Sequence, residues 1–258
     1  MTHNPAYRRI LTRMGYYAYQ NGLIYNHLNQ AGGWDEHLSR CRDFVKASIE
    51  KFRPETVTVL GSGWLLDVPL AEMSDKLNRI YLVDIIHPPE VIRQAGTMGN
   101  VVLVEADITG GVIEEVWNIS RRHTVLNRLR SLGTVRIGEF TPDFEPGTVV
   151  SLNILTQLES QPLHWLRGRS RIPGEELTAF RRKIQEKHID FLKRHNSVLI
   201  TDFSEVVIGR SGQETSVRTL LADLPPGKLE SEWTWNLDIT GRENYNSLIA
   251  MKMIGLAW

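Results

Sequence analysis

The stretch Val57–Gly63 reads VTVLGSG, and it decides the fold of this chain. Four consecutive apolar or β-branched residues are typical of a short strand that is buried on both faces. The glycines that follow allow a turn with positive φ and let a ligand approach the backbone closely. A buried strand that ends in such a turn before a helix is typical of the first strand of an open α/β sheet, where ligands bind outside the carboxyl end.

More short apolar runs follow along the chain, separated by stretches with helical spacing. The further predicted strands span residues 80–84, 101–104, 148–152 and 197–202, and the predicted helices span 68–77, 112–132 and 175–194. Buried strands that alternate with helices indicate a parallel sheet covered on both faces. Two last strand-like runs, 230–238 and 248–254, have no helix between them, which favours an antiparallel hairpin at the sheet edge. The predicted fold class is α/β, with a Rossmann-like, doubly wound, mostly parallel seven-stranded sheet.

The residues before the first predicted strand have the hydrophobic spacing of helices. Apolar residues recur at spacings of three and four from about Ala6 to Gln30, and again after Asp35 until Pro54 stops the pattern. We expect residues 1–53 to form an N-terminal helical cap and residues 54–258 to form the ligand-binding domain.

Composition excludes several classes of protein. The 258 residues carry 30 Lys and Arg against 30 Asp and Glu, so the formal net charge is zero and nucleic acid is a disfavoured main partner. The single cysteine, Cys41, excludes an internal disulfide and a multi-cysteine zinc site, and no metal site is predicted. The sequence shows neither a signal-peptide pattern nor an apolar run of roughly 18 residues, so a cytoplasmic protein without a membrane span is expected. The oligomeric state stays open.

Acidic residues follow the first strands at informative places. Asp84 ends the second predicted strand 21 residues after Gly63, a separation that places a carboxylate beneath the hydroxyls of a bound ribose. Asp107 follows the third strand, where an adenine edge would lie. A turn or helix-capping role is the alternative for both residues.

The residues after the glycine turn separate two kinds of cofactor. Leu66 stands where a dinucleotide site has its third glycine, and Asp67 stands at the predicted start of the next helix. A carboxylate there repels a pyrophosphate and attracts a cationic amine. S-adenosylmethionine carries an α-amino group, a ribose and an adenine, for which Asp67, Asp84 and Asp107 are suitable partners. Simple N-capping is the alternative for Asp67.

This order of elements resembles the class I S-adenosylmethionine-dependent methyltransferases. The resemblance covers about Pro54 to Trp258, and it departs from the family's first motif, acid-x-GxGxG, at Val59 and Leu65. It implies that the glycine turn lies beside the methionine and ribose, that Asp107 and Ile108 meet the adenine, and that Asn153 lies near the methyl group. The candidate cofactor-binding residues are Gly61, Ser62, Gly63, Asp67, Asp84, Asp107, Ile108 and Asn153.

Candidates for chemistry beyond cofactor binding are few. Methyl transfer needs a general base only when the acceptor must lose a proton, and the candidate catalytic residues are Asn153, Gln157 and His164. Asn153 and Gln157 are four residues apart and share a face if helix begins there; the alternative is that they satisfy backbone groups at a strand end.

An alternating set of arginines, at positions 167, 169 and 171, lies in a predicted loop. Arg167, Arg169 and Arg171 are candidates for binding an anionic ligand, and the alternative is a solvated loop.

The sequence as a whole therefore favours S-adenosylmethionine-dependent methyl transfer to a small-molecule acceptor. The alternatives are a non-catalytic methyltransferase-like interaction protein, a nicotinamide-dependent oxidoreductase, and transfer of an aminopropyl-type group in place of methyl.

Overall fold

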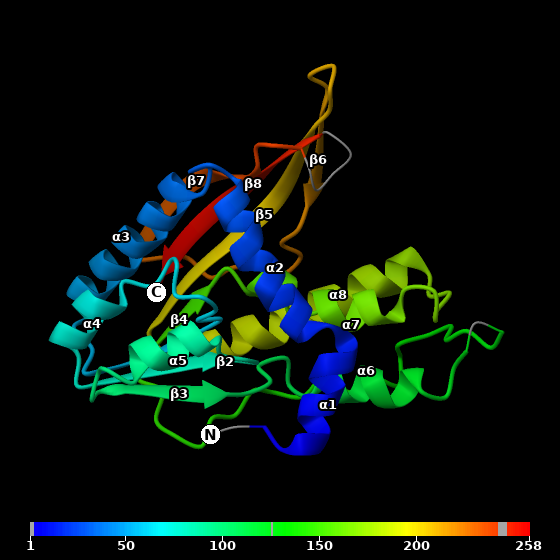
Figure 1. Cartoon of the computed structure of the whole chain (residues 1–258), viewed down its shortest axis with the longest axis horizontal. Helices are drawn as coiled ribbons and strands as arrows, with labels where there is room; N and C mark the ends of the chain where they lie inside the picture. Colours follow the sequence, from blue (N-terminus) through cyan, green and yellow to red (C-terminus); the bar gives the residue numbers. More distant parts are fainter. Residues whose placement is uncertain (1–2, 125, 242–246) are drawn as a thin grey trace.

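The computed structural model describes residues 3–124, 126–241 and 247–258, which form an α/β sheet with helices on both faces (Figure 1). The strands are β1 (Thr56–Leu60), β2 (Arg79–Asp84), β3 (Val101–Glu105), β4 (Thr148–Leu152), β5 (Ser197–Ile208), β6 (Glu214–Arg218), β7 (Leu229–Asp238) and β8 (Leu248–Ala257). The helices are α1 (Pro5–Met14), α2 (Tyr16–Asn29), α3 (Asp35–Phe52), α4 (Leu70–Lys76), α5 (Pro89–Ala95), α6 (Val112–Ser120), the 3₁₀ helix η1 (Leu155–Gln157), α7 (Ser160–Leu166) and α8 (Gly174–Leu192).

The strand order is β3-β2-β1-β4-β5-β8-β7, with β1 to β5 parallel and β8 and β7 antiparallel. The predicted Rossmann-like sheet with its antiparallel C-terminal pair is therefore confirmed. The chain leaves β1 toward β2 and β3 and then returns to β4 on the other side of β1. This reversal of direction creates a crevice outside the carboxyl ends of β1 and β4, which is where such sheets bind ligands.

The buried hydrophobic side chains form two clusters, because successive residues of each strand point to opposite faces of the sheet. Leu60 and Val149 belong to the hydrophobic cluster that contains side chains of α1, α6, α7 and α8, whereas Val59 and Val150 belong to the cluster beneath α3 and α4. Neighbouring residues of one strand point to opposite faces, so a strand covered on both faces must be apolar throughout.

The N-terminal helices begin and end where local chemistry requires. The side chain of Asn4 accepts the Tyr7 N–H at the start of α1, and Gly15, with a φ of 88°, separates α1 from α2. The single helix predicted from Ala6 to Gln30 is thus two helices. α3 covers the sheet beside β7, with Leu38 and Val45 in the core.

Two sequence predictions need correction. The helix predicted over 112–132 ends at Ser120, because Leu129 pairs instead with the loop after α7: its N–H donates to Arg169 O at 3.0 Å, and its carbonyl accepts the Arg171 N–H at 2.7 Å. The sheet also contains β6, an unpredicted short strand that pairs with the far end of β5. Both features depend on partners that are distant in sequence.

Candidate functional site

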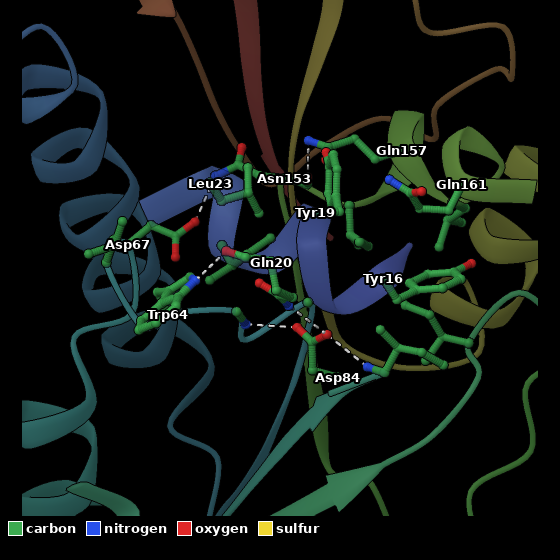
Figure 2. Close-up of a pocket in the computed structure, with 18 of the residues that line it drawn as sticks. Tyr16, Tyr19, Gln20, Leu23, Trp64, Asp67, Asp84, Asn153, Gln157 and Gln161 are labelled. Carbon is green, nitrogen blue, oxygen red and sulfur yellow. Dashed lines mark hydrogen bonds between the residues drawn. The ribbon is translucent and has the colours of Figure 1, made fainter. Parts of the chain in front are cut away.

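A pocket lies at the carboxyl ends of β1, β2 and β4, and Figure 2 shows α2 passing across it. It holds about 1130 Å³ of empty space, its open mouth included. Its wall combines the turn after β1, the ends of β2 to β4, residues of α2 and α3, and Trp235 of β7. The polar and charged side chains of the wall include Tyr16, Tyr19, Gln20, His37, Asp67, Asp84, Asp107, Asn153, Gln157 and Gln161.

The turn after β1 has the backbone that its glycines predict. Gly61 has a φ of 79°, and a Cβ there would lie 2.8 Å from Leu152 O. Gly63 has a φ of 47°, and both glycines line the pocket. Ser62, between them, is fully buried and does not line the pocket. Leu65, which replaces the third family glycine, also adopts a positive φ of 59°, so its backbone keeps a glycine-like conformation.

Asp67 does not cap a helix, so the capping alternative does not apply to it. The helix α4 begins only at Leu70, and Asp67 lies in the preceding loop. Its carboxylate accepts the Nδ2–H of Asn153 at 2.7 Å and faces the pocket (Figure 2). Burial raises the pKa of Asp67, while the Asn153 amide lowers it. A partly buried carboxylate whose side-chain hydrogen-bond partner is a neutral amide favours a cationic ligand group.

Asp84 lies at the bottom of the pocket. It accepts the Gly63 N–H at 2.7 Å and the Ile85 N–H at 2.7 Å, and Gln20 donates to it from α2 at 3.3 Å. Burial raises the pKa of Asp84, and the Gly63 N–H opposes that shift. The Gln20 amide therefore lies where a ribose hydroxyl would donate to the same carboxylate.

Asp107 makes hydrogen bonds within the turn after β3 and lines the pocket. It accepts two hydrogen bonds from Thr109, from the backbone N–H at 2.8 Å and from the hydroxyl, and it accepts a third from Tyr7 at 3.0 Å. The hydroxyl of Thr109 in turn accepts the Val112 N–H at the start of α6. Asp107 and its neighbour Ile108 also line the pocket.

Three hydrogen bonds join helix α2 to other parts of the pocket wall. Besides the bond from Gln20 to Asp84, the indole N–H of Trp64 donates to Gln20 O at 2.8 Å, and the hydroxyl of Tyr19 donates to Gln157 Oε1 at 2.6 Å. The Oε1 atom of Gln20 is buried without a hydrogen-bond partner among the described residues. A buried polar atom of this kind at a pocket wall is suited to a ligand donor.

Asn153 and Gln157 both line the pocket, and Gln157 satisfies a backbone carbonyl at the end of β4, which is the alternative that the sequence left open. Gln157 Nε2 donates to Asn153 O at 2.9 Å, and Asn153 has a positive φ of 49°. A non-glycine residue in this conformation costs free energy and is concentrated at ligand sites. His164 is not brought into the pocket: it is exposed on α7, on the wall of a neighbouring groove.

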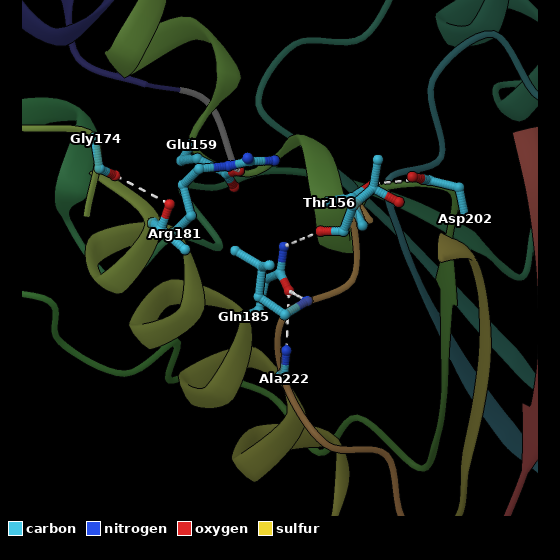
Figure 3. A network of polar contacts seen from close by, with 10 residues as sticks. Thr156, Glu159, Gly174, Arg181, Gln185, Asp202 and Ala222 are labelled. Carbon is cyan, nitrogen blue, oxygen red and sulfur yellow. Dashed lines mark hydrogen bonds and ion pairs between the residues drawn. The ribbon is translucent and has the colours of Figure 1, made fainter. Parts of the chain in front are cut away.

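Two buried acidic side chains form hydrogen bonds at and just after the short helix η1, which carries Gln157 (Figure 3). The hydroxyl of Thr156 donates to Asp202, and Arg181 Nε donates to Glu159 at 2.7 Å. Burial raises the pKa of Glu159, and the arginine opposes that shift. The first contact ties η1 to β5, and the second ties the residue before α7 to α8.

His37 is a pocket residue that the sequence did not indicate. Its Nδ1 accepts the indole N–H of Trp233 at 3.0 Å, and its ring stacks on Trp235 with centroids 4.2 Å apart. Because an indole nitrogen only donates, the proton of the neutral ring lies on Nε2, which is 3.5 Å from the sulfur of Cys41 and 3.3 Å from Asn153 Nδ2. The Cys41 sulfur is the acceptor within reach of this Nε2–H, and His37 is buried with only 1% of its surface exposed. No local signal marks it, since Trp233 is 196 residues away.

Replacing His37 with glutamine is expected to reduce the acid sensitivity of the fold. Burial lowers the pKa of His37 to about 3, whereas an unfolded histidine titrates near 6.5. The unfolded chain alone takes up this proton as pH falls from 7 to 5, so the wild type loses about 2 kcal/mol that the variant keeps. Denaturant unfolding at both pH values measures the difference. Exposed His164→Gln is the control, and equal pH dependence of wild type and His37→Gln would contradict a neutral buried ring.

Of the three arginines predicted to bind one anion together, two line the same groove and the third does not. Arg167 and Arg169 line the neighbouring groove with His164, whereas Arg171 does not line it. In the described residues, no group of three or more His, Cys, Asp or Glu side chains is placed to hold a metal ion. Within the same ranges, no helix is both long enough and apolar enough to cross a membrane.

Comparison with known proteins gives structural similarities only. No family model matches the sequence, and no curated protein matches it significantly. Among solved structures, the chain is similar to the Burkholderia thailandensis 1,6-didemethyltoxoflavin-N1-methyltransferase with bound 1,6-didemethyltoxoflavin and S-adenosylhomocysteine, at 10% identity and a TM-score of 0.45, over 100% of this chain and 91% of that chain. It is also similar to the N-methyltransferase NodS from Bradyrhizobium japonicum in complex with S-adenosylhomocysteine, at 10% identity and a TM-score of 0.36, over 84% and 86%. The fold assignment rests on the strand order given above.

Proposed function

We propose that this chain is an S-adenosylmethionine-dependent methyltransferase that acts on a small-molecule acceptor. One observation carries the proposal: Asp67, Asp84 and Asp107 converge on one pocket at the reversal point of the sheet, and its described wall contains no lysine or arginine. A negatively lined pocket suits a ligand with an amine, a sulfonium and two hydroxyl donors.

The residues present fit this cofactor. Asp67 would hold the α-amino group, because its carboxylate has only the Asn153 amide as a side-chain hydrogen-bond partner among the described residues. Asp84 would accept the ribose hydroxyls once the Gln20 amide gives up its bond of 3.3 Å. Asp107 and Ile108 would meet the adenine. Asp67, which follows the glycine turn, disfavours a nicotinamide dinucleotide, whose pyrophosphate it would repel.

The bound cofactor supplies a methyl group on a sulfonium that is a good leaving group. The chain contributes binding, orientation and exclusion of water. The α2 side chains Tyr19 and Gln20 cover the pocket, and Gln157 links Tyr19 to the carbonyl of Asn153. We therefore assign Gln157 a positioning role, in which it holds α2 and Asn153 together.

One observation favours the second candidate, a non-catalytic methyltransferase-like protein. The Gln20 amide occupies Asp84, the carboxylate that the ribose requires. In that case α2 would be a permanent cover, and the pocket would bind no adenosyl compound.

Thermal unfolding with separate additions of S-adenosylmethionine, S-adenosylhomocysteine, NAD and NADP distinguishes these functions. A ligand at a hundred times its dissociation constant stabilises the fold by about 2.7 kcal/mol, which raises the midpoint by roughly 5–10 °C in a chain of this size. We expect a shift with the two adenosyl compounds alone. A shift with the nicotinamide nucleotides alone, or with none of the four, would contradict the proposed function.

A further inference from the structure

A second hollow adjoins the pocket, between the α1–α2 junction and α7. It is an open groove of about 1210 Å³, its mouth included, and its wall carries the cations Arg13, Arg167 and Arg169 together with His164. No carboxylate lies on its described wall. The groove joins elements that are about 150 residues apart in the sequence, so only the fold brings Arg13 to the other cations.

The groove cations are available to a ligand. Neither Arg13 nor Arg167 forms an ion pair with any described residue, although the chain as a whole carries equal numbers of acidic and basic residues. Three arginines gathered on a wall without a carboxylate produce a local positive potential that attracts anions.

Contacts with Trp165 restrict the orientation of the Arg169 side chain. Its guanidinium lies over the ring of Trp165 at 3.9 Å, and its Nη1 donates to Trp165 O at 2.8 Å. Trp165 is itself fixed, because its indole N–H donates to Ser120 at 2.8 Å. The backbone carbonyl of Arg169 accepts the Leu129 N–H. The remaining guanidinium N–H groups therefore have a fixed orientation and lose little side-chain entropy on binding an anion.

The groove adjoins the pocket, since Tyr19 and Gln161 line both. The two spaces have opposite charge: the described pocket wall has three aspartates and no lysine or arginine, and the described groove wall has three arginines and no carboxylate. A molecule that spans them must have an uncharged or cationic end for the pocket and an anionic end for the groove.

We propose that the groove binds a phosphate or carboxylate group of the methyl acceptor, while the reacting end of the same small molecule enters the pocket. This inference rests on the proposed function. The carboxylate of the cofactor is the other available anion, but its amino acid end belongs beside Asp67. Figure 2 shows Asp67 and Gln161 on opposite sides of the pocket, so the groove lies away from that end.

Inorganic pyrophosphate is the probe for the anion site, with the full-length protein and no cofactor present. We expect saturable binding by calorimetry and by the tryptophan fluorescence that Trp165 contributes. The double variant Arg167→Ala/Arg169→Ala should lose at least about tenfold in affinity, since it removes charged hydrogen-bond donors. Arg171→Ala is the matched control, because this exposed arginine belongs to the same loop and lies outside the groove. It should bind pyrophosphate as the wild type does.

S-adenosylhomocysteine binding is measured separately in all three proteins. Equal affinity in the double variant and the wild type supports assignment of the groove to the acceptor, whereas a tenfold loss would assign it to the cofactor and overturn the inference. Absence of saturable pyrophosphate binding, or equal weakening by Arg171→Ala, would also overturn it. Binding of a short single-stranded RNA at least about a hundredfold tighter than pyrophosphate would replace the small molecule with a nucleic acid. If S-adenosylhomocysteine binds to none of the proteins, the proposed function fails, whatever pyrophosphate does.

Discussion

Replacing Asp84 with alanine is expected to weaken binding of S-adenosylhomocysteine by at least about tenfold, because the ribose hydroxyls lose a charged acceptor. The carboxylate is 7% exposed and lies against the N–H groups of Gly63 and Ile85, so its position is fixed before a ligand arrives. Calorimetric titration of the purified variant measures the loss.

The control for this variant is Asp75→Ala, which removes an exposed aspartate from α4. It should bind S-adenosylhomocysteine as tightly as the wild type. Asp84→Ala also removes the acceptor for two backbone N–H groups, so its fold is checked by circular dichroism and by its unfolding midpoint. A folded variant with unchanged affinity would remove Asp84 from the cofactor site.

Replacing Gly61 with alanine is expected to destabilise the fold by about 3 kcal/mol, which lowers the unfolding midpoint by roughly 6–12 °C. The added Cβ would lie 2.8 Å from Leu152 O and 2.9 Å from the Cβ of Ile154, and the φ of 79° is unfavourable for alanine. Leu152 O belongs to β4, so the turn can make room only by moving away from the sheet. The same movement would displace the pocket wall and weaken ligand binding.

The control for Gly61 is Gly99→Ala, at an exposed glycine where an added Cβ meets no atom within 4 Å. We expect its free energy of unfolding to change by no more than about 0.5 kcal/mol. Equal stability of the two variants would contradict the close approach of the turn to β4.

The sheet could be predicted from local patterns. The central parallel strands β1 and β4 are buried on both faces and therefore appear in the sequence as short continuous apolar runs, such as Val57–Leu60. The glycine turn was predicted for a similar reason, because a positive φ selects glycine at Gly61. The end of α6 was predicted wrongly, because the periodicity continues past Ser120 while Leu129 pairs with a loop about 40 residues away.

The candidate site was predictable only in part. Asp84 and Asp107 were found because they follow strands, and the carboxyl ends of parallel strands meet at one edge. The position of Asp67 relative to Asn153 was not predictable, because a loop and not a helix follows the turn.

The sequence by itself determined the five parallel strands, the C-terminal antiparallel pair and the edge at which acidic side chains gather, since these follow from hydrophobic periodicity and turn chemistry within short windows. Only the tertiary structure decided which distant side chains share one space. It placed His37 against Trp233, fastened Gln20 to Asp84, and brought Arg13 beside Arg169. Such contacts depend on how helices pack across the sheet, and packing is set by the summed fit of many side chains that no short window of sequence contains.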